Sequence, residues 1–255
     1  MKRISMVFKA VVLLSFCVFS TALWAGYDAI PVSDGGWITG KISYGGAPPA
    51  IKKIPATTDK QVCGKHGAIP SEELVVAPDS GIQFAVVYLA DIKAGKSLYN
   101  VPAPTLDQNG CRFQPHVLVA PVGKPMNVRN SDGILHNIHT TSLKNPPINI
   151  AQPGSVPEMT LGQFAIPELI KVNCDAHGWM SSWIWATNHP YAVVTNANGT
   201  FKIADIPGGK YRLEVWHEKL GKLSSEVTVA EGKETKLNLV FPAKSVAPKA
   251  GAGKK

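Results

Sequence analysis

The stretch Cys174–Met180 reads Cys-Asp-Ala-His-Gly-Trp-Met and lies between two short apolar runs, Leu169–Val172 and Trp183–Ala186. Apolar runs of this length that carry β-branched and aromatic residues predict buried strands. The stretch itself places a thiol, an imidazole and a thioether three residues apart. A loop between two strands can turn all three side chains toward one point. The stretch therefore predicts a β fold that carries a metal-binding loop.

A second imidazole comes from far upstream, where His136 and His139 compete. Residues three apart on a strand point to opposite faces, so only one of the two histidines can face the loop. His136 follows the Asp-Gly pair at 132–133, a turn signal that would deliver it to the end of a sandwich. His139 leads into Thr140–Thr141, where a solvated strand face is favoured. We therefore expect His136 as the upstream ligand.

Two imidazoles and a thiolate, with a weak axial thioether, are the ligands of blue-copper electron-transfer sites. Soft sulfur favours Cu(I) and imidazole suits Cu(II), so a site that combines them can pass one electron with little rearrangement. The sequence predicts one copper ion held by His136, Cys174, His177 and Met180. Taken singly, Cys174 could be half of a disulfide, His177 a surface histidine and Met180 a core residue, but their spacing favours the joint assignment.

The first 25 residues have the pattern of a secretory signal peptide. Lys2 and Arg3 precede the apolar stretch Val11–Trp24, which is shorter than the roughly 20 residues that a membrane-spanning helix needs. We expect cleavage after Ala25, with an uncleaved anchor as the alternative. The mature protein is then periplasmic or secreted and has no stable membrane span.

Export leaves three cysteines, an odd number for an oxidising compartment. Because Cys174 is assigned to the metal, we expect a disulfide between Cys63 and Cys111. The alternative is that Cys63 and His66, in a Cys-Gly-Lys-His sequence, bind a metal of their own.

The formal net charge of +8 does not indicate a nucleic-acid partner. Residues 1–25 carry three of the basic residues, and the Ala/Gly/Pro-rich tail 243–255 carries four lysines and no acids. The remaining body is therefore close to neutral, at about +1, whereas nucleic-acid binding needs a basic stripe on a folded face. We expect the tail to be disordered.

The region from Cys111 to Trp185 resembles the cupredoxins, in particular the amicyanin kind with its short Cys-x-x-His-x-x-Met loop. Phe113–Pro115, Val117–Val119 and the His-Asn-Ile-His sequence at 136–139 fall where that family has its strands and first ligand. The resemblance implies a Greek-key β-sandwich with His136 as ligand, and it implies that the residue after it, Asn137, steadies the ligand loop.

This sequence departs from the cupredoxin pattern at two places. Glu168 and Ile170 stand where many cupredoxins have Gly and Tyr before the cysteine strand. The bulky Trp179 precedes the axial Met180.

Residues 36–58 and 191–241 together resemble a carboxypeptidase-regulatory-like, prealbumin-like β-sandwich, a module that implies no chemistry of its own. Its two halves are far apart in the sequence, which suggests that the cupredoxin part is inserted into it. The combination is similar to methylamine-utilisation-type periplasmic proteins. We expect an N-terminal β segment over 26–100 that can pair with the C-terminal sandwich, a copper domain over 101–187, and the small sandwich over 188–242.

The expected function is that of a periplasmic electron carrier with a redox partner protein such as a c-type cytochrome. The alternatives are a copper-handling protein without an electron-transfer role and a binding or scaffold module. An enzyme is not expected, because the chain has no nucleophile elbow, no paired catalytic carboxylates and no phosphate loop. The sequence leaves open whether His189, His217 and Glu218 meet at the domain junction as a second site.

Overall fold

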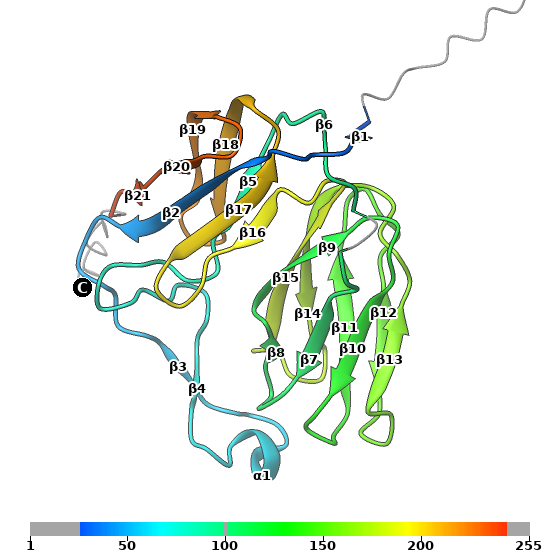
Figure 1. Ribbon diagram of the computed structural model, residues 1–255. Coiled ribbons are helices and arrows are strands. Elements are labelled where there is room, and N and C mark those ends of the chain that lie inside the picture. The colour runs from blue at the N-terminus through cyan, green and yellow to red at the C-terminus, as the bar shows by residue number, and fades with distance from the viewer. Residues whose placement is uncertain (1–25, 99–100, 244–255) are drawn as a thin grey trace, which may run out of the picture.

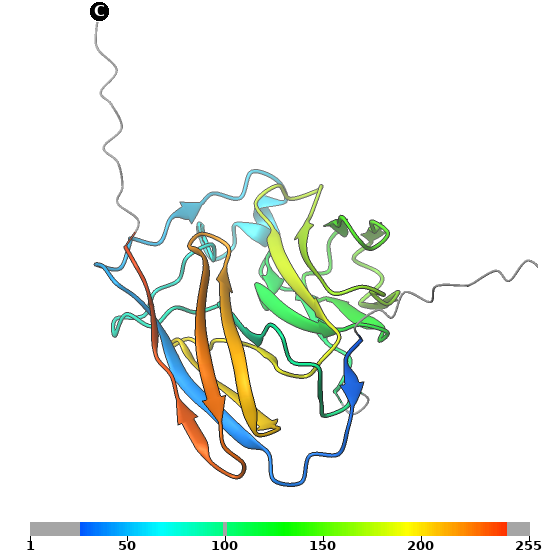
Figure 2. The same ribbon diagram turned by 90° about the horizontal axis from the view of Figure 1, so that it is seen from above.

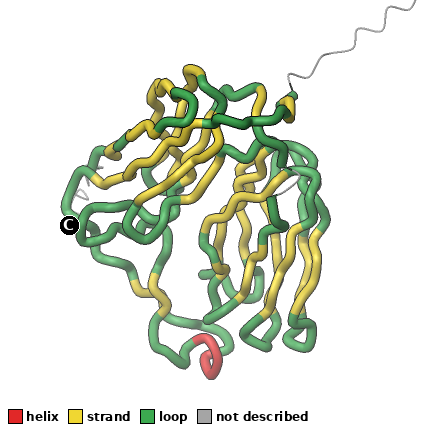
Figure 3. Tube along the Cα trace, viewed as in Figure 1, coloured by secondary structure: helices red, strands yellow, loops and turns green. Residues whose placement is uncertain are grey.

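The computed structural model describes residues 26–98 and 101–243, and most of its regular structure is β-strand (Figure 3). The strands form two sandwiches that lie side by side (Figures 1 and 2). In the described part of the chain, no helix has the length and apolar character needed to cross a bilayer. The signal peptide and nearly all of the tail expected from the sequence lie outside the described residues.

The first sandwich has nine strands: β7 (Thr105–Gln108), β8 (Phe113–Gln114), β9 (Val117–Pro121), β10 (Met126–Asn130), β11 (His136–Thr141), β12 (Asn149–Gln152), β13 (Glu158–Leu161), β14 (Glu168–Asn173) and β15 (Ser181–Thr187). One sheet has the order β13-β10-β7-β8 and the other the order β12-β11-β14-β15-β9. The pairs β7–β10 and β9–β15 are parallel, so the chain crosses over between sheets instead of running as a simple meander. The chain is all-β, and this sandwich has a cupredoxin-like Greek-key architecture.

The core of the first sandwich lies between its two sheets. Alternation along β10 places Met126 and Val128 inside, while Ile138, Ile170 and Ile184 come from the opposite sheet. Apolar side chains repeating at every second residue bury one face of each strand, which fixes the register of the sheet. This register brings the start of β11 and the end of β14 to one end of the sandwich.

The second sandwich combines strands from both ends of the chain: β2 (Gly36–Tyr44), β5 (Val86–Leu89), β16 (Ala192–Val194), β17 (Thr200–Ile206), β18 (Gly209–His217), β19 (Gly221–Val229), β20 (Glu234–Lys236) and β21 (Leu239–Phe241). One sheet has the order β16-β5-β18-β19, and in the other β2 lies between β17 and the short strands β20 and β21. The whole first sandwich is therefore inserted in sequence between β5 and β16.

Four short strands and one helical turn complete the fold. They are β1 (Asp28–Ala29), which pairs with β6 (Ala94–Gly95), and β3 (Lys53–Ile54), which pairs with β4 (Ile69–Pro70). The turn α1 (Lys60–Cys63) lies between β3 and β4, and this excursion from the second sandwich reaches the lower end of the first sandwich in Figure 1.

The two sandwiches meet through a contact region that is both apolar and polar. Trp183 of the first sandwich packs against Trp216 of the second, with ring centroids 5.2 Å apart. His116 Nδ1 lies 3.1 Å from the Ser181 carbonyl, and its Nε2 pairs with Glu218. The Trp183 indole donates to the same Glu218 carboxylate at 3.1 Å. His116 therefore has a structural role at this interface.

Glu168, the residue that departs from the cupredoxin pattern at the start of β14, holds the turn after β11. Its carboxylate accepts hydrogen bonds from Ser142 Oγ at 2.6 Å, from Asn145 Nδ2 at 2.9 Å and from the backbone of residues 143–145. Burial opposes ionisation of Glu168, but these bonds outweigh it and lower the pKa to about 2. A glycine at this position could not hold the turn.

Replacing Glu168 with glutamine is expected to destabilise the protein at neutral pH. The folded-state pKa is depressed, so the carboxylate contributes stability that is fully present above pH of about 4.5 and is lost as the pH falls toward 2. With solvent screening we expect a loss of about 1–2 kcal/mol at pH 7, and a clearly smaller loss at pH 3. Urea unfolding at the two pH values measures both. The exposed Glu158→Gln is the matched control, and equal penalties for Glu168→Gln at both pH values would contradict the assignment.

Candidate metal centre

Four side chains proposed from the sequence come to one end of the first sandwich. His136 is the first residue of β11, Cys174 follows β14, and His177 and Met180 lie on the loop that leads into β15. Two backbone hydrogen bonds close this loop, from Cys174 N to the Met180 carbonyl at 3.3 Å and from Met180 N to the His177 carbonyl at 2.8 Å. All four side chains are buried.

Three donor atoms converge in this buried space. The Nδ1 atoms of His136 and His177 are 3.0 Å apart, and Cys174 Sγ lies 3.9 Å from the first and 3.7 Å from the second. Ligand bonds of about 2.0–2.3 Å in a trigonal plane would place such donors about 3.5–3.8 Å apart. The separation of Cys174 Sγ from His177 Nδ1 lies in this range, and that from His136 Nδ1 exceeds it by about 0.1 Å. The nitrogen pair needs to open by about half an ångström. Among the described residues this trio is one of two groups of three donors close enough to hold a metal ion.

The thioether of the proposed axial ligand belongs to the same environment. Met180 is buried with Cys174 in the core of the first sandwich, and Trp179 packs against that core from the loop. Ligation by the Met180 sulfur stays a prediction, and the convergent donors are the two imidazoles and the thiol.

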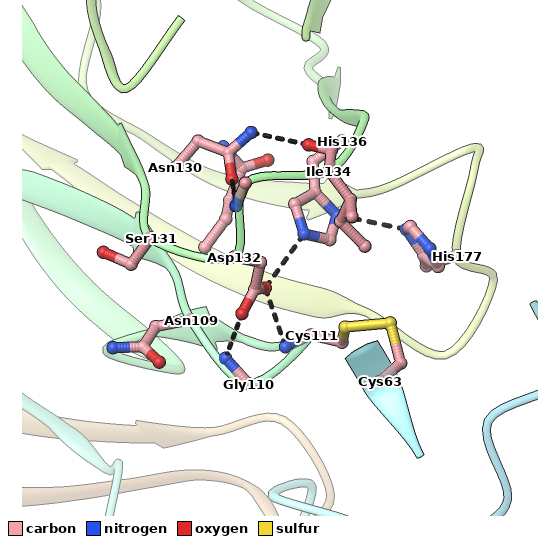
Figure 4. A network of polar contacts seen from close by, with 12 residues as sticks. Cys63, Asn109, Gly110, Cys111, Asn130, Ser131, Asp132, Ile134, His136 and His177 are labelled. Carbon is pink, nitrogen blue, oxygen red and sulfur yellow. Dashed lines mark hydrogen bonds and ion pairs between the residues drawn. A yellow bond between two sulfur atoms is a disulfide. The ribbon is translucent and has the colours of Figure 1, made fainter. Parts of the chain in front are cut away.

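The far nitrogen of each histidine ring is held by a carboxylate. His136 Nε2 lies 2.9 Å from Asp132 Oδ2, and His177 Nε2 lies 2.9 Å from Asp59 Oδ2. Figure 4 shows His136 between Asp132 and His177. A carboxylate that accepts the Nε2 proton leaves the Nδ1 lone pair free for a metal and fixes the plane of the ring. Asp132 is itself held by the backbone amides of Gly110 at 2.7 Å and Cys111 at 2.9 Å.

The electrostatics of the centre favour a thiolate. Burial would raise the pKa of the Cys174 thiol, but hydrogen bonds from His136 and from the backbone of Asn137 and His177 outweigh it and lower that pKa. Burial opposes protonation of His136, yet its bonds to Asp132 and Cys174 raise its pKa to about 9. Burial lowers the pKa of His177 against the pull of Asp59. The site thus pairs a thiol of lowered pKa with two imidazoles, a donor set that suits a soft or borderline cation.

His139 lies outside this group. Its side chain is 42% exposed, and its Nδ1 pairs with Asp175 at 2.9 Å. Asn137, between the two histidines, accepts a hydrogen bond from the Asp175 amide and donates to the Asp175 carboxylate at 3.2 Å. Asn137 therefore ties β11 to the ligand loop directly after Cys174.

A disulfide joins Cys63 of α1 to Cys111, with Cα atoms 5.3 Å apart. Cys111 also belongs to the second close group of donors, with Asp132 and His136, but its sulfur is already bonded. The Trp179 indole donates to the Cys111 carbonyl at 3.1 Å, and its ring lies 5.1 Å from that of His177. The bulky residue before Met180 thus fills space beside the site.

The possible second site at the domain junction does not form. Glu218 pairs with His116, His189 packs against the rings of Tyr27 and Tyr191, and His217 packs near Phe241. Within the described ranges, neither these three residues nor His66 belong to a group of three close metal donors. Burial lowers the pKa of His189 to about 4, so it stays neutral in its aromatic setting.

Sequence reasoning missed both carboxylates that orient the histidines. Asp132 lies only four residues before His136 in the sequence. A carboxylate so close to a proposed histidine ligand could have been predicted to orient its ring. Asp59 is 118 residues from His177, and nothing in its local sequence indicates the contact.

Comparison with known proteins gives a partial likeness to copper proteins. The family model described as polysaccharide lyase family 4, domain II, matches residues 160–237, and a search of curated proteins finds no match. A copper-containing nitrite reductase from Thermus scotoductus SA-01 is 23% identical with a TM-score of 0.31, over 39% of this chain and 25% of its own. This chain thus spans about a quarter of the length of that reductase.

Two smaller copper proteins are also similar. A purple cupredoxin from Nitrosopumilus maritimus is 18% identical with a TM-score of 0.28, over 34% of this chain and 100% of its own. An oxidised point mutant of amicyanin is 16% identical with a TM-score of 0.30, over 47% of this chain and 96% of its own. TM-scores this low add nothing to what the side chains indicate. Strand order and the donor trio give the conclusion: an all-β chain whose cupredoxin-like sandwich carries a buried cluster able to hold a metal.

Proposed function

We propose that this protein is an exported, one-copper protein that accepts and releases single electrons. The observation that carries the proposal is the convergence of His136 Nδ1, His177 Nδ1 and Cys174 Sγ within 4.8 Å of one another in a buried space. Met180 would complete the proposed ligand set with a thioether. This donor set combines soft sulfur with imidazole, which is the combination found at blue-copper electron-transfer sites.

The chain contributes ligands whose positions are fixed before any metal arrives. Asp132 and Asp59 set the two imidazole planes, and Asn137 fixes the loop beside Cys174. Ligands held in this way would move little when bound copper changes between its two oxidation states. A small rearrangement of the ligands favours fast electron transfer. Copper, when bound, would supply the one-electron chemistry.

The proposed partner is a redox protein such as a c-type cytochrome, and the proposed compartment is the periplasm or the exterior. The Cys63–Cys111 disulfide supports an oxidising compartment. The burial of the two histidine ligands and the cysteine disfavours a role in which copper is readily given away, because the donors are covered.

A stopped-flow experiment tests the electron-carrier role. Copper(II)-loaded protein is mixed with a reduced c-type cytochrome, and oxidation of the haem is followed. We expect a bimolecular rate constant on the order of 10⁵–10⁷ M⁻¹s⁻¹, as for docking of two specific protein surfaces. Zinc-loaded protein is the matched control, because zinc takes the same imidazole and thiolate ligands and has no redox chemistry. Equal rates for the copper and zinc forms would contradict the carrier role.

A further inference from the structure

The segment 53–70, which we call the cover, belongs by sequence to the second sandwich but closes the metal end of the first. It leaves after β2, runs through β3, α1 and β4, and has α1 at its tip (Figure 1). Ile69 and Cys63 of the cover are buried in the core of the first sandwich, and Ala56 packs against it. The disulfide from Cys63 to Cys111 fastens the tip covalently.

Asp59, at the start of α1, has a conformation that local structure does not favour. Its φ of 46° and ψ of 43° lie in the left-handed region, which costs energy for a residue other than glycine, although Asp and Asn tolerate it best. Asp59 occupies the N-cap position of α1, yet its side chain makes no capping hydrogen bond. An aspartate at an N-cap ordinarily accepts a bond from the helix backbone. Here the carboxylate is turned away from the helix and accepts from His177 Nε2 instead.

The cover leaves no part of the His177 ring in contact with solvent. His177 is 0% exposed, whereas Asp59, which touches its Nε2, is 45% exposed. The Nε2 edge of the imidazole, on the far side of the ring from Nδ1, therefore meets a carboxylate that is itself half-exposed. The disulfide is also connected to the His136 ring. The backbone amide of Cys111 donates to the Asp132 carboxylate, which in turn contacts His136 Nε2.

We propose that the cover is a disulfide-tethered shield over His177, and that Asp59 is the positioning residue through which it holds this ligand in place and keeps the metal from leaving. The proposal rests on the proposed function only in taking His177 as a metal ligand. The disulfide and Asp59 act as one unit, since the crosslink is what keeps Asp59 at the ring. A strained backbone and an unused capping position both point to selection for the contact with His177 rather than for the helix.

The rate of Cu(I) loss to an excess of bicinchoninate tests the shield. Asp59→Gly removes the carboxylate while suiting the left-handed backbone, so it should speed copper loss about 10–100-fold, the range for loss of an outer partner of a ligand histidine. Asp59→Asn keeps an acceptor and tolerates the same backbone, so it should have a smaller effect. Gln61→Ala, an exposed change in the same helical turn, is the matched control and should stay within about twofold of the wild type.

A variant without the disulfide tests whether the two parts act as one unit. Cys63→Ala with Cys111→Ala should release copper at least as fast as Asp59→Gly. Adding Asp59→Gly to that pair should change the rate little, because a released cover no longer presents the carboxylate. Additive effects of the two changes would overturn the tether.

A measurement on the metal-free protein tests the inference without copper and without the double-cysteine variant. The His177 Nε2 proton, observed by nitrogen-resolved NMR, should exchange with solvent at least about tenfold faster in Asp59→Gly than in the wild type, by the logic of local opening. A blue-copper site gives an intense visible absorption band from charge transfer between its thiolate and copper(II). If Asp59→Gly leaves proton exchange and copper loss unchanged while this band is present, the shield alone is overturned. Absence of that band from the wild type would instead overturn the proposed function.

Discussion

Replacing Cys174 with serine is expected to abolish the intense visible absorption of the copper(II)-loaded protein. That absorption would arise from charge transfer between a thiolate and copper, and a hydroxyl lacks the soft, easily ionised sulfur that it requires. The environment of Cys174 already lowers the thiol pKa, so the wild-type residue is prepared to bind as thiolate. We expect copper affinity to fall by a factor of about 100 or more, since a ligand is lost and loss of an outer partner alone costs 10–100-fold.

The serine variant is a conservative change in volume at a site that is only 2% exposed, so the fold should persist. Circular dichroism in the near ultraviolet provides the check on folding. An absorption band that survives Cys174→Ser would show that a different cysteine thiolate binds the metal. The other described cysteines, Cys63 and Cys111, are joined in a disulfide, so such a result would contradict the site and the crosslink together.

The two histidines on β11 are expected to respond in opposite ways to alanine substitution. His136→Ala removes a buried ring whose Nδ1 is 3.9 Å from Cys174 Sγ, so the copper–thiolate colour should be lost. It also removes the imidazole partner of Asp132, whose carboxylate keeps only the backbone amides of Gly110 and Cys111, so we expect a loss of stability of about 1 kcal/mol. His139→Ala removes a half-exposed ring that contacts Asp175, so the colour should remain, with at most a small shift in reduction potential.

Absorption spectra of the two copper-loaded variants, measured side by side, decide between the histidines. Urea unfolding of the metal-free proteins separates loss of the ligand from loss of the fold. Colour lost with His139→Ala and kept with His136→Ala would reverse the assignment of the upstream ligand.

The ligand loop could be predicted because its chemistry is local. Cys174, His177 and Met180 lie within seven residues, between two apolar runs that form β14 and β15. The second sandwich was expected from the likeness of two segments, far apart in the sequence, to one module, and the pairing of β2 with β17 agrees with that expectation.

Features that depend on distant parts of the chain were not predicted, because no short stretch of sequence indicates them. Three of the four residues of the strand β12 are exposed, and its sequence has no alternation of apolar and polar residues that would indicate a strand. It is a strand through its pairing with β11. The single turn α1 is too short to show a helical period, and the disulfide at Cys63 holds it in place. The contact of Asp59 with His177 depends on the path of the whole cover, which no short window of sequence contains.

Titration of the metal-free protein with copper(II), followed by visible absorption, tests the central claim most directly. The account predicts an intense thiolate-to-copper band that grows in proportion to added copper and stops at one equivalent, because one buried group of His136, Cys174 and His177 provides one site. A copper-loaded protein that shows only the weak absorption of copper bound by nitrogen and oxygen would contradict the claim.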